Sequence, residues 1–129
     1  MVDILQVHHL AIICSDYARS KAFYTEVLGL TILRETYRAE RQSYKLDLAL
    51  NGRYLIELFS FPDPPGRLSR PEGRGLRHLA FEVENIDATV RRLAELGIEA
   101  EPVRIDALTG KAFTFIADPD GLPLEFYER

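Results

Sequence analysis

The first half of the chain alternates short apolar stretches of strand length with one amphipathic stretch of helical length. The expected strands of this half are residues 6–14, 31–37, 43–50 and 53–61, and the expected helix is 15–30. Ser15 or Asp16 can cap the start of this helix, and Gly29 is placed to end it. The Asn51-Gly52 pair between the last two strands is a strong signal for a tight hairpin. The pattern therefore predicts a βαβββ module.

The second half of the chain repeats this order of elements. Its expected strands are residues 76–83, 98–104, 111–118 and 122–128, and its expected helix is 85–97. A segment rich in Pro, Gly and Arg, residues 62–75, separates the halves and suits neither helix nor strand. We therefore expect one domain over 1–129, built from a module at about 5–61 and a second at about 76–128.

The two halves also share short sequences, which is the strongest single signal in the chain. "HLAI" at 9–12 matches "HLAF" at 78–81, and "IELF" at 56–59 matches "LEFY" at 124–127. This alignment places His9 opposite His78, while His8 falls opposite Arg77. Because successive strand residues point to opposite faces, we expect His9 to face a site and His8 to point away from it.

Four residues at matched positions of the repeat could ligate a metal ion. Two such modules are expected to pair about an approximate two-fold axis, within one chain or between two chains, which brings equivalent residues together. The axis would gather His9, Glu57, His78 and Glu125, a plausible octahedral set with two open positions. Both glutamates sit in apolar strands, where an unpaired carboxylate costs several kcal/mol. The alternative is that arginines such as Arg53 or Arg77 neutralise them.

Composition narrows the class of protein. The 129 residues are 47% hydrophobic and 28% charged, which is ordinary for a globular domain. The net charge of -4, with no Lys/Arg stripe, argues against nucleic acid and membrane surfaces as partners. The N-terminal apolar run is too short for a membrane span and lacks the positive charge of a signal peptide, so we expect a cytoplasmic protein. Cys14, the single cysteine, is expected to be a buried thiol.

The chain resembles the vicinal oxygen chelate superfamily. The resemblance rests on the two modules, the "HHLAI" and "RHLAF" strands, the "FYTEVLGL" helix end and the terminal "DPDGLPLEFYE". That superfamily includes glyoxalase I, fosfomycin resistance proteins, bleomycin-binding proteins and extradiol dioxygenases. The resemblance covers Val7 to Glu128 and implies an α+β fold in which two βαβββ modules form a curved, eight-stranded mixed sheet. It also implies a homodimer.

The same resemblance implies an activity. All four metal positions are filled, as His9, Glu57, His78 and Glu125, which is similar to the bacterial glyoxalase I pattern. That pattern implies one divalent ion, Ni, Zn, Co or Mn, and a lyase or isomerase that transfers a proton on a small oxygenated substrate. The resemblance makes Glu125 the catalytic base, with Glu57 able to exchange roles with it.

The chain departs from glyoxalase I at two glutathione contacts. Ile13 stands where the family has an arginine, and Phe61 stands where it has an asparagine, which argues against the glutathione hemithioacetal as substrate. Two alternatives stay open: a thiol transferase like the fosfomycin resistance proteins, and a small-molecule binding protein without catalysis.

Basic residues could hold a small anionic substrate. The candidate substrate-binding residues are Arg38, Lys45, Arg74 and Lys111. Tyr44, Phe113 and Phe115 could supply apolar walls, although aromatic strand residues are often plain core.

Overall fold

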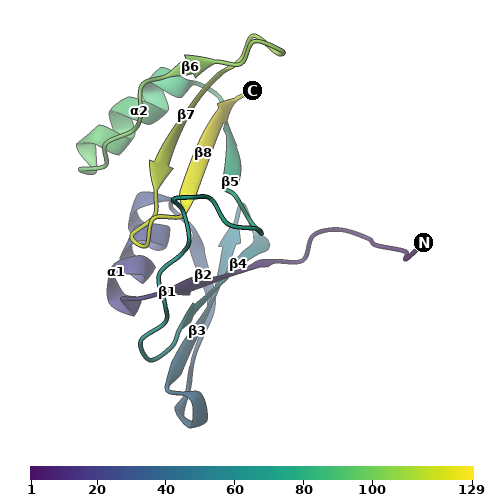
Figure 1. The fold of residues 1–129 in the computed structure, drawn as a ribbon, viewed down its shortest axis with the longest axis vertical. Coiled ribbons are helices and arrows are strands. Elements are labelled where there is room, and N and C mark those ends of the chain that lie inside the picture. The colour runs from purple at the N-terminus through teal and green to yellow at the C-terminus, as the bar shows by residue number, and fades with distance from the viewer. The chain divides into compact units, whose positions relative to one another are not determined.

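A computed structural model describes all residues, 1–129, and the chain divides into two compact units (Figure 1). The first unit spans Met1–Pro65 and the second Gly66–Arg129. Each contains four strands and one main helix in the order βαβββ, so the α+β class and the repeated module are confirmed. No helix has the length and apolar character needed to cross a membrane.

The first unit begins with residues 1–9, which form no strand, and the N-terminal end of this segment extends away from the sheet (Figure 1). Its elements are β1 (Leu10–Cys14), α1 (Tyr17–Ala22), a π-helical turn (Phe23–Val27), β2 (Thr31–Arg38), a 3-10 turn (Ala39–Arg41), β3 (Ser43–Leu50) and β4 (Arg53–Ser60). The Asp16 side chain accepts a hydrogen bond from the Arg19 backbone N–H and caps α1, as predicted. Asn51 and Gly52 both have positive φ, which the tight β3–β4 turn requires.

The second unit repeats this arrangement with a longer helix. Its elements are β5 (Leu79–Val83), α2 (Ile86–Glu95), β6 (Arg104–Ile105), β7 (Ala112–Ala117) and β8 (Pro123–Glu128). Asn85 caps α2 by accepting from the Ala88 N–H, and the Glu128 carboxylate accepts from the Ile86 N–H. Two of the free backbone donors at the start of this helix are thereby satisfied.

Hydrogen bonding joins the eight strands into two four-stranded mixed sheets of the same topology. Their orders are β1-β4-β3-β2 and β5-β8-β7-β6. In each sheet the first strand runs parallel to the last strand of its module, and the other pairs are antiparallel. The registers match as well, because Ala11 lies opposite Glu57 and Ala80 lies opposite Glu125. The sequence repeat is therefore a structural repeat.

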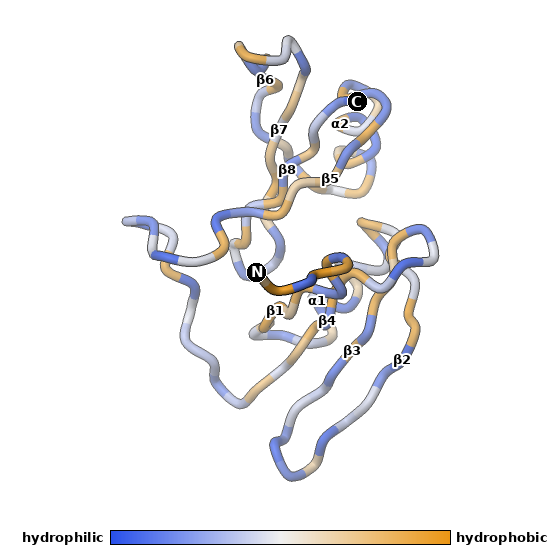
Figure 2. Tube along the Cα trace, turned by 90° about the vertical axis from the view of Figure 1, so that its right-hand side faces the viewer, coloured by the Kyte–Doolittle hydropathy of each residue, from blue (hydrophilic) through white to orange (hydrophobic).

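Alternation along the strands separates a buried face from a more open face. Leu46, Leu48, Ile56 and Leu58 are fully buried in the first unit, as is Leu124 in the second. Their odd-numbered neighbours on β3, β4 and β8 point to the other face, which carries the polar residues described below. The turn that joins β2 to β3 is hydrophilic and lies at the far tip of its hairpin (Figure 2).

Three predicted strands are shorter than expected. One of them is β5, which begins at Leu79 rather than at residue 76. β1 begins at Leu10 rather than at residue 6, since the backbone of 6–9 pairs with no strand. The predicted strand 98–104 is reduced to Arg104–Ile105, although the Glu101 N–H still donates to the Phe115 carbonyl. Pro102 has no N–H to continue that ladder, which accounts for the interruption.

Candidate metal centre

The first His–Glu pair lies at the start of the first unit's sheet. His9 directly precedes β1, and Glu57 is on β4, the strand that pairs with β1. His9 Nε2 lies 3.6 Å from Glu57 Oε1, and the side chains are 34% and 14% exposed. The imidazole thus presents a ring nitrogen to a mostly buried carboxylate that a small ligand can still reach.

Glu57 is held by polar neighbours that the sequence reading did not single out. The single Tyr54 hydroxyl proton is shared between two carboxylates, Asp47 Oδ1 at 2.5 Å and Glu57 Oε2 at 3.1 Å. Lys45 Nζ lies 3.4 Å from Glu57 Oε2 and 3.8 Å from Asp47 Oδ1. Burial and the two carboxylate contacts raise the pKa of Tyr54 well above its usual range, so the hydroxyl keeps its proton and acts as a donor.

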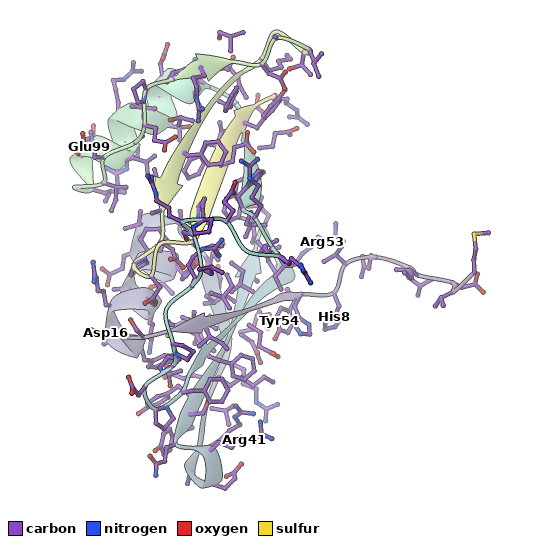
Figure 3. All side chains as sticks on the ribbon, in the orientation of Figure 1. His8, Asp16, Arg41, Arg53, Tyr54 and Glu99 are labelled. Atoms are coloured by element: carbon purple, nitrogen blue, oxygen red, sulfur yellow. The ribbon has the colours of Figure 1, made fainter.

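His8 lies on the same side as His9, which corrects the expectation that the two histidines point apart. Their Nδ1 atoms are 2.8 Å from each other, and both rings contact Tyr54. Figure 3 shows His8 and Tyr54 side by side, far from Arg41 at the hairpin tip. The alternation rule fails here because both histidines precede the first residue of β1. A proton shared between the Nδ1 atoms would leave Nε2 of His9 free to bind a metal.

The second His–Glu pair has the same placement in the second unit. His78 directly precedes β5, and Glu125 is on β8, the strand paired with β5. His78 Nε2 lies 3.0 Å from Glu125 Oε2, and these side chains are 30% and 13% exposed. The Phe115 ring packs edge-on against the imidazole, with centroids 5.2 Å apart.

The pairs differ in what surrounds them. Phe115 lies opposite Glu125 in the sheet, at the position that Asp47 holds opposite Glu57. Leu122 stands three residues before Glu125, at the position of Tyr54. Glu125 consequently receives no tyrosine hydrogen bond and pairs with no lysine, although the Tyr127 hydroxyl is near enough to interact with it electrostatically. No group of three or more His, Cys, Asp or Glu side chains placed to hold a metal ion occurs in the structure.

A concavity of about 880 Å³ opens beside the second pair, entirely within the second unit. His78 and Glu125 are among its lining residues, together with Phe113, Phe115 and Arg104. Arg70 and Arg77 line it from the segment that precedes β5. The space suits a small organic molecule whose polar end reaches the histidine and carboxylate.

Arginine does not neutralise either glutamate. Arg53 donates to the Gln6 side chain at 2.7 Å, and Arg77 pairs with Glu72 at 2.7 Å. The Arg77 guanidinium holds the pKa of Glu72 below its usual range. Lysine, from the neighbouring strand β3, is the cation beside Glu57.

Of the four predicted substrate-binding residues, only Lys45 lies beside a predicted ligand. Arg38 is stacked over Phe59 and Phe61 and donates to Ser43 Oγ. Lys111 donates to the Arg129 carbonyl at 2.6 Å, and Arg74 is exposed. Neither Lys111 nor Arg74 lines the concavity, and all four roles stay predictions.

Sequence reasoning missed Tyr54, Asp47 and Arg104. Tyr54 stands three residues before Glu57 across a register shift between β3 and β4, so spacing alone does not place its hydroxyl. Asp47 could have been predicted as a site residue, because it is an acidic residue among the apolar residues of β3.

The chain thus consists of two βαβββ units, each with a histidine directly before its first strand and a glutamate on its last strand. The family model of the Glyoxalase/Bleomycin resistance protein/Dioxygenase superfamily matches residues 6–126, and the chain belongs to this superfamily.

Individual relatives agree with that assignment. The chain is 66% identical over 123 residues to the uncharacterized protein YwkD of Bacillus subtilis, covering 95% of this chain and 96% of that protein. It is 31% identical to the lactoylglutathione lyase of Salmonella typhimurium, covering 96% and 93%. The crystal structure of a glyoxalase family protein from Enterococcus faecalis matches with a TM-score of 0.89 and 51% identity, covering 95% and 97%.

Proposed function

We propose that His9, Glu57, His78 and Glu125 together bind one divalent metal ion, and that the protein is a glyoxalase-like lyase or isomerase. The observation that carries this proposal is the recurrence of one His–Glu pair, at one register, in both units. A coincidence would have to place a histidine and a glutamate at the same register in both units. Glu125, which pairs with no lysine or arginine, is the carboxylate for which burial in an apolar strand is otherwise costly.

The donor chemistry fits such an ion. Two imidazoles and two carboxylates are suited to Ni, Zn, Co or Mn. Each histidine nitrogen lies close to a carboxylate oxygen of its own pair, at 3.6 Å for His9 and Glu57 and at 3.0 Å for His78 and Glu125, so one ion could contact both members of a pair.

The surroundings of the two glutamates support different roles for them. Tyr54 and Lys45 restrain Glu57, which suits a carboxylate that stays in place as a ligand. Glu125 contacts His78 and makes no ion pair with a lysine or an arginine, which suits a carboxylate that moves a proton. Glu125 is therefore the proposed base.

The reaction follows from these roles. The metal ion, when bound, would polarise a carbonyl of the substrate and make the adjacent C–H more acidic. The Glu125 carboxylate takes the proton from that carbon, which bears a hydroxyl group, and returns it to the former carbonyl carbon. The hydroxyl proton passes to the former carbonyl oxygen, so the net change is an isomerisation without an added oxidant or reductant. Phe113 and Phe115 limit access of water to the carbon while the proton is on the glutamate.

The substrate is proposed to differ from that of lactoylglutathione lyase. Ile13 is more than half exposed on β1, and Phe61 stacks on Phe59, so neither position offers a polar contact. The chain keeps the proposed proton-transfer residues but lacks the two polar contacts for glutathione. This combination favours a smaller oxygenated substrate.

Metal-reconstituted protein tests the proposal in a turnover screen with 2-oxoaldehydes, alone and with several thiols. We expect turnover that is lost in Glu125→Gln while metal binding persists. Full turnover in Glu125→Gln would remove Glu125 as the base, and ligand binding without any turnover would favour the binding-protein alternative.

A further inference from the structure

The concavity of the second unit contains an arginine held in an unusual way. The Arg104 guanidinium lies over two rings, with its central carbon 5.0 Å from the Phe113 centroid and 5.5 Å from that of Phe115. Stacking of this kind uses the flat face of the guanidinium and leaves its in-plane N–H donors available. The side chain is thus restrained while its hydrogen-bonding edge stays open.

One acidic side chain orients Arg104 without using all its donors. Glu101 Oε2 lies 3.1 Å from Arg104 Nη2, and no other carboxylate pairs with Arg104. The remaining N–H groups can bind two oxygens of a carboxylate or phosphate side by side. Both side chains are more than half exposed, so a ligand can reach them.

A second arginine lines the same concavity with no ion pair of its own. Arg77 is neutralised by Glu72, but Arg70 pairs with no acidic side chain. Arg70 therefore adds a positive charge to the concavity that an anionic group can neutralise.

We propose that Arg104, stacked on Phe113 and Phe115, is the subsite that recognises an oxyanion of the substrate. This inference rests on the proposed function and extends it. The substrate class would be a small molecule with chelating oxygens at one end, an apolar middle against the two rings, and a carboxylate or phosphate at the Arg104 end.

Metal-free protein provides the test, so that binding at Arg104 is measured separately from metal chemistry. The probes are phenyl phosphate, benzoate and the uncharged benzyl alcohol, titrated while backbone amide NMR signals are followed. We expect phenyl phosphate or benzoate to shift signals of residues around Arg104, and benzyl alcohol to bind at least tenfold more weakly. The relative affinities of the two anions identify which oxyanion the subsite prefers.

Variants connect the binding to this arginine. Arg104→Met is expected to weaken binding of the preferred anion at least tenfold, and Glu101→Gln is expected to strengthen it severalfold by freeing a donor. Arg92→Met is the matched control, because Arg92 pairs with Glu95 at 2.8 Å in another i,i+3 pair, on α2 and outside the concavity.

Equal anion binding by Arg104→Met and the native protein would overturn the subsite. The same conclusion would follow if the three probes bound equally. A protein that binds anions at Arg104 but takes up no metal would instead retain the subsite and refute the proposed function.

Discussion

Individual side chains account for the difference between the two glutamates. Glu57 receives a hydrogen bond from Tyr54 and lies beside Lys45, whereas Glu125 faces His78 and an aromatic wall. The repeat makes the two carboxylates equivalent in sequence. Their neighbours, which vary between the modules, make them unequal in chemistry.

Tyr54 is expected to act as a positioning residue for the first pair. It stacks on His9 with centroids 5.1 Å apart and donates to Glu57, so it restrains both predicted ligands. Tyr54→Phe keeps the ring and removes the donor. We expect about a tenfold loss of metal affinity in titrations of chelator-treated protein. Tyr37→Phe is the control, because Tyr37 lies on β2 and packs against the Tyr44 ring rather than against a predicted ligand; equal losses in both variants would contradict this role.

Substitution of the two histidines that precede β1 is expected to lower metal affinity to different extents. His9→Ala removes a ligand and should lower metal affinity by more than a hundredfold. His8→Ala removes only the contact to His9 Nδ1, and we expect a loss of about tenfold or less. Calorimetric metal titration of both variants measures the difference, and the opposite order would make His8 the ligand.

Contacts between elements include a surface cluster that joins α1 to β2. Glu35 on β2 accepts hydrogen bonds from Lys21 at 2.6 Å and from Tyr17 at 2.5 Å, both on α1. These contacts, led by that of Lys21, hold the pKa of Glu35 below its ordinary value of 4.5. Because the folded pKa is the lower one, the stabilisation is complete above the unfolded pKa and is lost as pH falls through the folded value.

Glu35→Gln should therefore lower the free energy of unfolding at pH 7 by less than about 1 kcal/mol, as is usual for an exposed cluster. The difference from the native protein should shrink below about pH 4.5. Urea denaturation at several pH values measures it. Glu26→Gln is the control, since Glu26 makes no ion pair; a difference that grows in acid would contradict the assignment.

The elements themselves were largely predictable from the sequence. Asp16 and Asn85 cap the two helices as their chemistry requires, and Asn51-Gly52 forms the expected turn. The failures occurred where no local signal decides the pairing. Residues 6–9 have a strand pattern without a partner strand, and Pro102 interrupts an otherwise plausible strand.

For the whole molecule, the repeat predicted which residues share a structural position, and the matched registers confirm it. It could not predict the side chains that reach across strands, such as Tyr54 to Asp47, because these depend on the register shift in β3 and β4. The homodimer, the cytoplasmic location and the single domain stay predictions.

The central claim is that both His–Glu pairs ligate the same ion, and metal stoichiometry tests it most directly. Full-length protein, stripped with a chelator, reloaded with Ni, Zn, Co or Mn and desalted, should retain one ion per chain. His9→Ala and His78→Ala should each lose it. Two ions per chain, or one ion kept after either substitution, would mean that the pairs act separately; no bound ion with any of the four metals would contradict the metal centre itself.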